Sequence, residues 1–183
     1  MRIPFLLLLS FFSHFLFSQD CEYQLCTFCD FQADYSNIWL GTTFQGTIGD
    51  GNQRIEVRFL SIGKAEGTRN QYHSFGKSKV NANICDFSGT LSLQQEYILD
   101  PSNPYCEGPD YFDGYIVGAY LLKENPNQQH VGEFRGTLKS YVDVSSGSPR
   151  AARGWISDKG MHEFRGKWQA YGASSGKYCS WGM

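Results

Sequence analysis

Helical patterning is nearly absent from this sequence. After residue 18, no segment keeps apolar side chains at i, i+3, i+4 and i+7 over three turns, the pattern of an amphipathic helix. The stretch FQADYSNIWLG (31–41) has room for one short helical turn. Strand signals recur instead, so we expect an all-β protein.

A second long hydrophobic run is also missing. The first 18 residues, MRIPFLLLLSFFSHFLFS, combine the early cation Arg2 with an apolar run and the small residue Ser18. This is the pattern of a secretory signal peptide, and the run is too short to span a bilayer comfortably. We therefore predict a signal peptide over residues 1–18, a secreted or periplasmic protein, and no membrane span after signal removal. An uncleaved anchor and a lipid-modified Cys21 are the alternatives.

The chain has no excess of charge of one sign. Its formal net charge is −2, and removing the first 18 of its 183 residues takes away Arg2 and no acid, which leaves −3 on 165 residues. That length suits one domain with a core of its own. The charge balance gives no electrostatic reason to expect a nucleic-acid partner or an anionic membrane surface.

All six cysteines follow the signal, and an even count in an exported protein predicts disulfides. Because three of them cluster near the N-terminus, full pairing would staple a Cys-rich segment (19–39) to the antiparallel β domain (40–183). Zinc at the Cys26-x2-Cys29 pair is the rival interpretation, but no second such pair exists. The predicted disulfide residues are Cys21, Cys26, Cys29, Cys85, Cys106 and Cys179.

Alternating apolar residues and turn signals predict about eight strands. Their expected ranges are 40–48, 53–62, 67–76, 85–93, 111–123, 131–144, 151–157 and 162–171. Eight antiparallel strands can close into an up-and-down barrel that holds side chains or one small ligand. We therefore predict a disulfide-stabilised, single-domain antiparallel barrel, with a two-sheet β-sandwich as the alternative.

One pentad, Phe-x-Gly-x-apolar, occurs five times, starting at Phe44, Phe87, Phe112, Phe134 and Phe164. In a strand the first, third and fifth residues share a face, so phenylalanine, glycine and the last apolar residue should all look toward the core. A glycine between two large side chains leaves room for a neighbour and lets the strand bend sharply. We therefore attribute the repetition of the pentad to the bend that each of these strands must make.

The last two pentads lie within a longer repeat, EFRGTLKSY (133–141) and EFRGKWQAY (163–171). Its alternate residues, including Glu133, Arg135, Glu163 and Arg165, are expected on the outer face. If a strand over 151–157 lies between the copies, their outer rows run in the same direction, two strands apart. The rival interpretation turns the arginines into the barrel to grip a polar ligand, which would leave the phenylalanines in water.

The Gly-Thr-bearing strands FQGTI, FSGTL and FRGTL resemble those of calycin barrels, the lipocalin and avidin group. That resemblance implies a barrel fold. The chain departs from the calycin pattern where Trp39 precedes Gly41, since Gly-x-Trp is expected there, and no ligand-contacting residues are carried over. The strings CDFSGTL and YCSWG are similar to strings in secreted bacterial β proteins. This second resemblance implies no particular activity.

The most site-like segment is DPSNPYCEGPDYFDG (100–114), a long acidic and aromatic connection between two strands. Long ordered loops are often functional. We predict ligand contacts there, and its carboxylates could alternatively hold Ca²⁺. No other cofactor or metal is expected. The candidate ligand-binding residues are Tyr105, Glu107, Asp110, Tyr111 and Asp113.

No catalytic pattern stands out, since H-x-H, HExxH and G-x-S-x-G spacings are all missing. We expect His73, His130 and His162 to be exposed and independent. The leading hypothesis is a secreted, non-catalytic barrel that binds a small molecule or glycan at its mouth near the 100–114 loop. The alternatives are a structural or protein-interaction module without a pocket, and a secreted hydrolase that uses His130 or His162 with nearby carboxylates.

Overall fold

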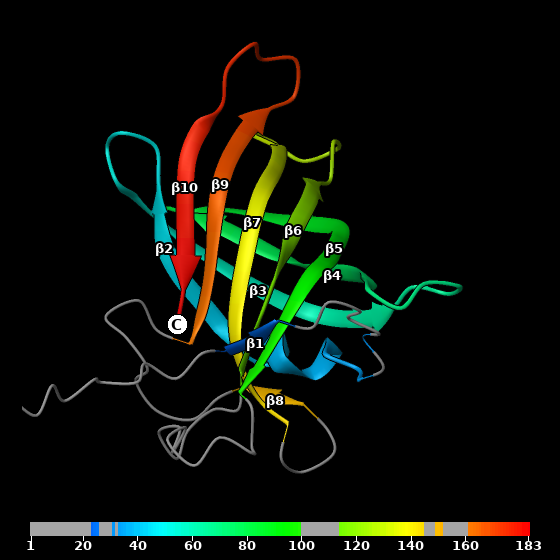
Figure 1. Cartoon of the computed structure of the whole chain (residues 1–183). Helices are drawn as coiled ribbons and strands as arrows, with labels where there is room; N and C mark the ends of the chain where they lie inside the picture. The colour runs from blue at the N-terminus through cyan, green and yellow to red at the C-terminus, as the bar shows by residue number, and fades with distance from the viewer. Residues whose placement is uncertain (1–22, 26–30, 32, 100–113, 145–148, 152–160) are drawn as a thin grey trace, which may run out of the picture.

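A computed structural model describes residues 23–25, 31, 33–99, 114–144, 149–151 and 161–183 (Figure 1). Predictions that fall on other residues, including the signal peptide, lie outside the described part of the chain. The elements are β1 (Tyr23–Leu25), the 3₁₀ helix η1 (Ser36–Trp39), β2 (Thr43–Ile48), β3 (Gln53–Lys64), β4 (Gln71–Val80), β5 (Asn83–Leu99), β6 (Gly114–Glu124), β7 (Gly132–Asp143), β8 (Arg150–Ala151), β9 (His162–Ala170) and β10 (Lys177–Gly182).

Eight strands form a closed antiparallel barrel, with β1 added outside along the end of β5. Strands β3 to β7 each pair with the preceding strand, β9 pairs with β7, β10 pairs with β9, and β10 also pairs with β2 to close the ring. The prediction of an all-β, up-and-down barrel is confirmed, and the sandwich alternative is wrong. Closure gives every barrel strand a neighbour on both sides, which removes exposed sheet edges.

Several strand ranges differ from the prediction, among them β4, which ends at Val80, and β5, which ends at Leu99. The eighth barrel strand is β10, and the sequence analysis predicted no strand there. The predicted strand at 151–157 is represented by β8, two residues that pair with the end of β7, and residues 152–157 lie outside the described ranges.

The two copies of the long repeat are adjacent and antiparallel, which corrects the expectation of parallel rows two strands apart. Strand β7 pairs directly with β9, and Gly136 lies opposite Gly166. Around that pair the copies are related by a local twofold: Phe134 faces Trp168, and Leu138 faces Phe164. The outer rows therefore run in opposite directions, side by side.

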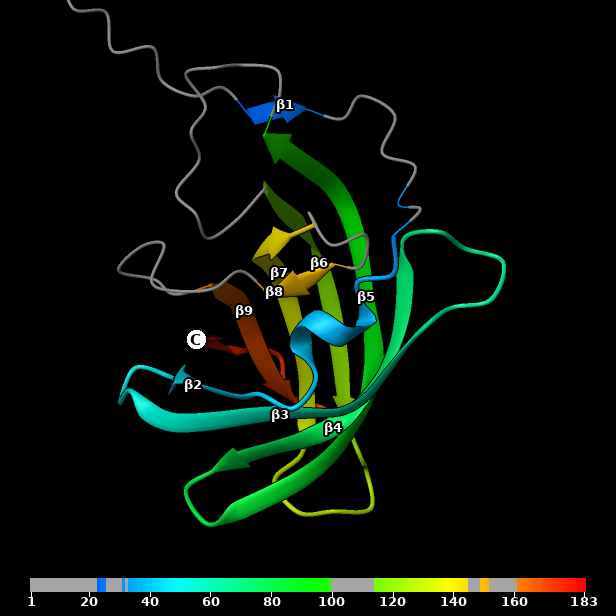
Figure 2. The same cartoon turned by 90° about the horizontal axis from the view of Figure 1, so that it is seen from below.

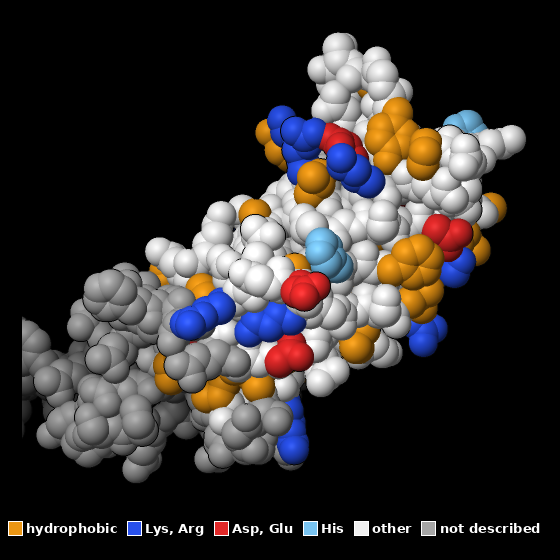
Figure 3. Space-filling model, turned by 90° about the vertical axis from the view of Figure 1, so that its right-hand side faces the viewer, with side chains coloured by type: hydrophobic (Ala, Val, Ile, Leu, Met, Phe, Trp, Pro, Cys, Tyr) orange, Lys and Arg blue, Asp and Glu red, His pale blue; other side chains and the backbone are white. Residues whose placement is uncertain are grey.

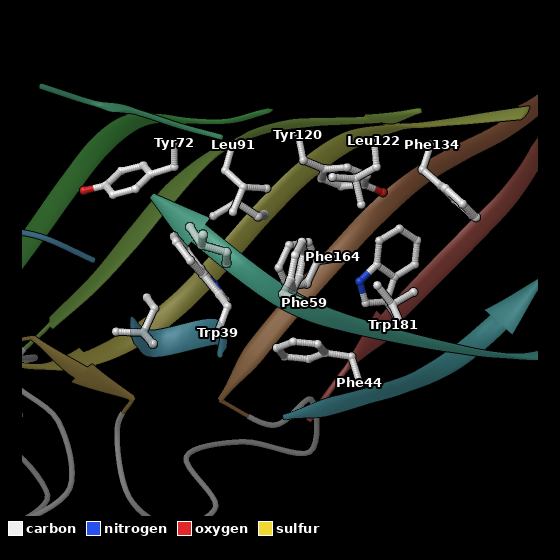
Figure 4. Packing of buried hydrophobic residues seen from close by; sticks show 14 of the residues in the cluster. Trp39, Phe44, Phe59, Tyr72, Leu91, Tyr120, Leu122, Phe134, Phe164 and Trp181 are labelled. Atoms are coloured by element: carbon white, nitrogen blue, oxygen red, sulfur yellow. The ribbon is translucent and has the colours of Figure 1, made fainter. Parts of the chain in front are cut away.

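The phenylalanines of four pentads face inward, as predicted, and Phe112 of the remaining pentad lies outside the described residues. Phe44, Phe87, Phe134 and Phe164 are all buried, while Arg135 and Arg165 project to the outside with more than half of each side chain exposed. The rings pack against each other, with Phe164 stacked on Trp181 at 5.7 Å between ring centroids. Figure 4 shows these aromatic and aliphatic side chains meeting across the interior from opposite walls. The middle of the barrel is thus occupied by side chains, in the way that small barrels are.

The pentad glycines are required because the strands approach each other too closely for a Cβ atom. At each of the five, an added Cβ would lie only 1.9–2.1 Å from a carbonyl oxygen of the neighbouring strand. At Gly166 the nearest atoms are the Arg135 carbonyl oxygen and the Tyr120 hydroxyl, which points into the interior. The pentad therefore combines a core aromatic with the point where the sheet coils most tightly.

The lower end of the barrel is closed by η1, as the view from below shows (Figure 2). Its Trp39 is fully buried, and the preceding Tyr35 also belongs to the core. The indole of Trp39 donates a hydrogen bond to the hydroxyl of Ser140 on β7, at 2.9 Å. The predicted short helical turn is confirmed, and part of the N-terminal segment serves as a plug of the barrel.

The outer surface is polar with scattered apolar side chains. On the side that Figure 3 shows, charges of both signs are interspersed and the hydrophobic side chains form small separate groups. The large apolar residues that are exposed on β3 to β5 are Leu60, Phe75 and Ile84. None of the helical structure in the described ranges has the length and apolarity that a membrane-crossing helix needs.

The glycine constraint predicts a large difference between two glycine substitutions. We expect Gly166→Ala to lower the free energy of unfolding by about 1–3 kcal/mol, because the added methyl group collides with the β7 backbone. Gly63→Ala is the control, since nothing lies within 4 Å of its added Cβ, and it should change stability by less than about 0.5 kcal/mol. Urea unfolding of both variants measures this, and equal effects would contradict the close approach.

Candidate functional site

The predicted binding loop cannot be placed, because Tyr105, Glu107, Asp110, Tyr111 and Asp113 lie outside the described residues. β5 ends and β6 begins at the end of the barrel that η1 plugs. The described hollow at a barrel mouth lies at the opposite, upper end.

This upper mouth is framed by four turns, which join β2 to β3, β4 to β5, β6 to β7 and β9 to β10 (Figure 1). A pocket of about 360 Å³ opens between them. That volume lies within the range of small-molecule sites, which combine apolar walls with a few convergent polar groups. Its polar or aromatic lining includes Gln53, Asn81, Asn83, His130, Trp168 and Lys177.

Glu124 forms the polar base of this mouth. It is 4% exposed, and both of its carboxylate oxygens accept hydrogen bonds. The hydroxyl of Ser78 donates to Oε1, while the backbone N–H of Gly132 and the indole N–H of Trp168 donate to Oε2, each at 2.9 Å. A buried carboxylate needs such donors. Three neutral donors from β4, β7 and β9 thus tie three walls of the mouth to one side chain on β6.

Trp168 and Lys177 come from the last hairpin, where they face each other across the β9–β10 ladder. Trp168 occupies the inward position that Leu138 has in the other copy of the repeat, but at the upper end of the barrel. Its ring centroid lies 6.4 Å from that of Phe134 and 5.8 Å from the Lys177 ammonium. A half-buried indole under a cation therefore forms one wall of the pocket.

The turns around the mouth contain non-glycine residues with left-handed backbone. Asn52 (φ 47°), Asn81 (φ 55°) and His130 (φ 54°) each lie in one of the connections at this rim. Asparagine is often found in that conformation, whereas histidine adopts it less often. Such residues cluster at ligand sites, because the surrounding fold holds side chains in positions that a relaxed turn would not give.

The three histidines are separate, and one of them contradicts the prediction. His73 and His130 are exposed as expected, but His162 is buried at the lower end, where its Nδ1 lies 2.9 Å from Ser140 Oγ. His162 and Glu163 are on opposite faces of β9, since they are consecutive residues of one strand. Within the described residues, no group of three histidine, cysteine or acidic side chains could hold a metal ion.

The prediction that all six cysteines form disulfides is wrong for Cys85 and Cys179, which are free and buried. Both point inward, but from β5 and β10, which are not neighbours in the sheet. Burial raises the pKa of the Cys179 thiol to about 12. The other four cysteines lie outside the described residues.

Sequence reasoning missed the residues that form the mouth. Glu124 could have been found, because it continues the inward row of Tyr120 and Leu122 along one strand. An acid in that row predicts a buried carboxylate with donors around it. Lys177 could not have been found, since its strand was not recognised.

Comparison with known proteins finds no match: no family model, no curated protein and no solved structure corresponds to this chain. The candidate site therefore rests on its own geometry.

The buried His162 predicts an acid-sensitive fold. Burial lowers the pKa of His162 to about 4, below its unfolded value of about 6.5. The neutral ring therefore contributes stability that is complete above pH 6.5 and is lost as the pH falls toward 4, about 3 kcal/mol in total. Chemical unfolding between pH 4 and 7 measures this slope.

His162→Asn should reduce that pH dependence, because the amide keeps a polar group near Ser140 and does not titrate. His73→Asn, on the exposed face of β4, is the matched control and should leave the slope unchanged. An equal slope in the wild type and in His162→Asn would contradict the assignment.

Proposed function

We propose that the protein is a secreted, non-catalytic binding protein that takes a small polar molecule, a saccharide in the first instance, in its upper mouth. The observation that carries this proposal is the pocket of about 360 Å³ in which amide, ammonium and indole groups from separate strands converge. Export rests on the predicted signal peptide. The sequence predicted a ligand site near the 100–114 loop. The site proposed here is instead the pocket at the upper end of the barrel.

The chemistry of the lining suits hydroxyl groups. The amide of Gln53 can donate and accept, and Lys177 adds a donor. The amide nitrogen of Asn83 already donates to Cys85 Sγ and to the Gln129 carbonyl oxygen, so Asn83 offers its side-chain oxygen as an acceptor. Trp168 offers an apolar ring face beside them, and sugars have both apolar ring faces and hydroxyl edges. A saccharide therefore matches the mixed lining better than a purely apolar molecule does.

The hydrogen bonds that Glu124 accepts favour a binding function over a catalytic one. Its two oxygens are already held by three donors, so it is poorly placed to take a proton from a substrate. Among the residues lining the mouth it is the one carboxylate, whereas glycoside hydrolysis uses a pair across the sugar.

A structural or protein-interaction module is the second candidate, because the interior is filled with side chains. On the outer wall, Tyr97, Tyr115 and Tyr141 are aligned across β5, β6 and β7, with Tyr97 and Tyr115 stacked at 4.4 Å. The ammonium of Lys139 lies 3.9 Å from the Tyr115 ring centroid. Such an aromatic row suits a protein surface, but no concave site is described over it.

A saccharide panel tests the mouth directly. We expect at least one mono- or disaccharide to raise the melting temperature and to change the tryptophan fluorescence through Trp168. In the double variant Gln53→Ala/Lys177→Met, binding should weaken by about tenfold or more, because two hydrogen-bonding groups are lost. Calorimetric titration gives the affinities.

The matched control is Lys79→Met, which removes a lysine from the outer face of β4 and should leave the affinity unchanged. If no compound in the panel shifts the melting temperature, or if the mouth variant binds as well as the wild type, the proposal fails and the interaction-module candidate becomes the better one.

A further inference from the structure

A second, larger hollow lies on the outside of the barrel wall. It has a volume of about 960 Å³ and runs over the outer faces of β2, β10, β9 and β7, the strands at the left and front of Figure 1. Glycines of all four strands line it, at points where neighbouring strands approach each other closely. We call this hollow, with its lining residues Arg135, Glu163, Arg165, Lys167, Tyr178 and Ser180, the outer groove.

The outer groove is cationic. Arg135, Arg165 and Lys167 line it, and Glu163 is the one acid among its described lining residues. In the antiparallel pairing of the two repeat copies, Arg135 lies opposite Lys167 and Arg165 lies opposite Thr137. The Gly136–Gly166 pair, which faces inward, stands between these two outward pairs. The formal net charge of the whole chain is −2, so this cluster is a local feature and not part of a generally basic surface.

The arginines are available for a ligand. Arg135 pairs with Glu133 and Arg165 with Glu163, each two residues earlier on the same strand, and the two arginine side chains are 62% and 55% exposed. Exposed ion pairs of this kind contribute about 0–1 kcal/mol. A guanidinium has five donors, so each arginine can bind a second carboxylate or sulfate without losing its own partner.

The remaining lining favours a carbohydrate over a peptide. Thr47, Thr137 and Ser180 provide hydroxyl groups along the groove, and Tyr178, 71% exposed, offers a ring at its upper end. The Lys167 ammonium lies 4.8 Å from that ring centroid. The barrel is closed, so its wall has no free strand edge with which an extended peptide could pair. Recognition here must use side chains, which suits hydroxyl groups and acidic groups on a sugar chain.

We propose that the outer groove binds an anionic glycan, a chain of uronic-acid or sulfated sugars, through Arg135, Arg165 and Lys167. Acidic groups spaced along the chain would pair with the two arginines, while the sugar hydroxyls bond to the threonines and Ser180. This site is separate from the mouth: along β10, Lys177 faces the mouth and Tyr178 faces the outer groove.

The outer groove is tested by calorimetric titration of the folded protein with an oligogalacturonate and with a sulfated galactan oligomer. Both should bind, more weakly at high salt, and a neutral galactan of equal length should not bind detectably. In Arg135→Gln/Arg165→Gln the affinity should fall by about tenfold or more, because two charge-assisted contacts are lost.

The control is Lys77→Gln/Lys79→Gln, which removes the same charge from ion-paired residues on the outer face of β4. It should bind as the wild type does, and so should Gln53→Ala/Lys177→Met, which separates this site from the mouth. The proposal is overturned if neither anionic oligomer binds or if the neutral galactan binds equally well. It is also overturned if polyglutamate or single-stranded DNA of equal charge binds more tightly, or if either control variant weakens binding as much as the arginine variant.

Discussion

The close approach of neighbouring strands at the inward glycines sets the shape of this barrel. Where the Cβ of residue 136 or 166 would be, a carbonyl oxygen of the next strand already lies about 2 Å away. That approach lets the sheet coil tightly enough for eight strands to close, and in the five pentads a phenylalanine stands two residues before the glycine. The tight wall and the ring of aromatic side chains then fill the interior together.

A filled interior determines where binding can occur. The sequence predicted a ligand at the barrel mouth near the 100–114 loop, whereas our two proposals use surface hollows, one at the opposite rim and one on the wall. Both hollows depend on the alternation of inward and outward side chains along the same strands. The inward row of β9 ends in Trp168 at the mouth, while its outer row carries Arg165 and Lys167 into the outer groove. The repeated sequence therefore serves architecture on its inner face and supplies distinctive chemistry on its outer face.

Sequence alone predicted the parts that depend on alternation. The inward pentads, the barrel and the short turn at Ser36–Trp39 all follow from local pattern. The adjacency of β7 and β9 did not, because a local pattern does not say whether the strand between two repeats joins the wall. The burial of His162 was missed for a related reason: only the plug formed by Trp39 and the hydroxyl of Ser140 gives that ring a place inside. That Cys85 and Cys179 are free could not be predicted either, because the sequence does not say which strands are neighbours.

The orientation of the pentads is the claim on which everything else depends, and nuclear Overhauser contacts in the folded protein test it most directly. The structure predicts strong contacts among the rings of Phe44, Phe164 and Trp181, and none between these rings and the side chains of Arg135 or Arg165. Contacts from either arginine to the central rings, together with solvent-exposed phenylalanines, would contradict the barrel described and both binding sites proposed on it.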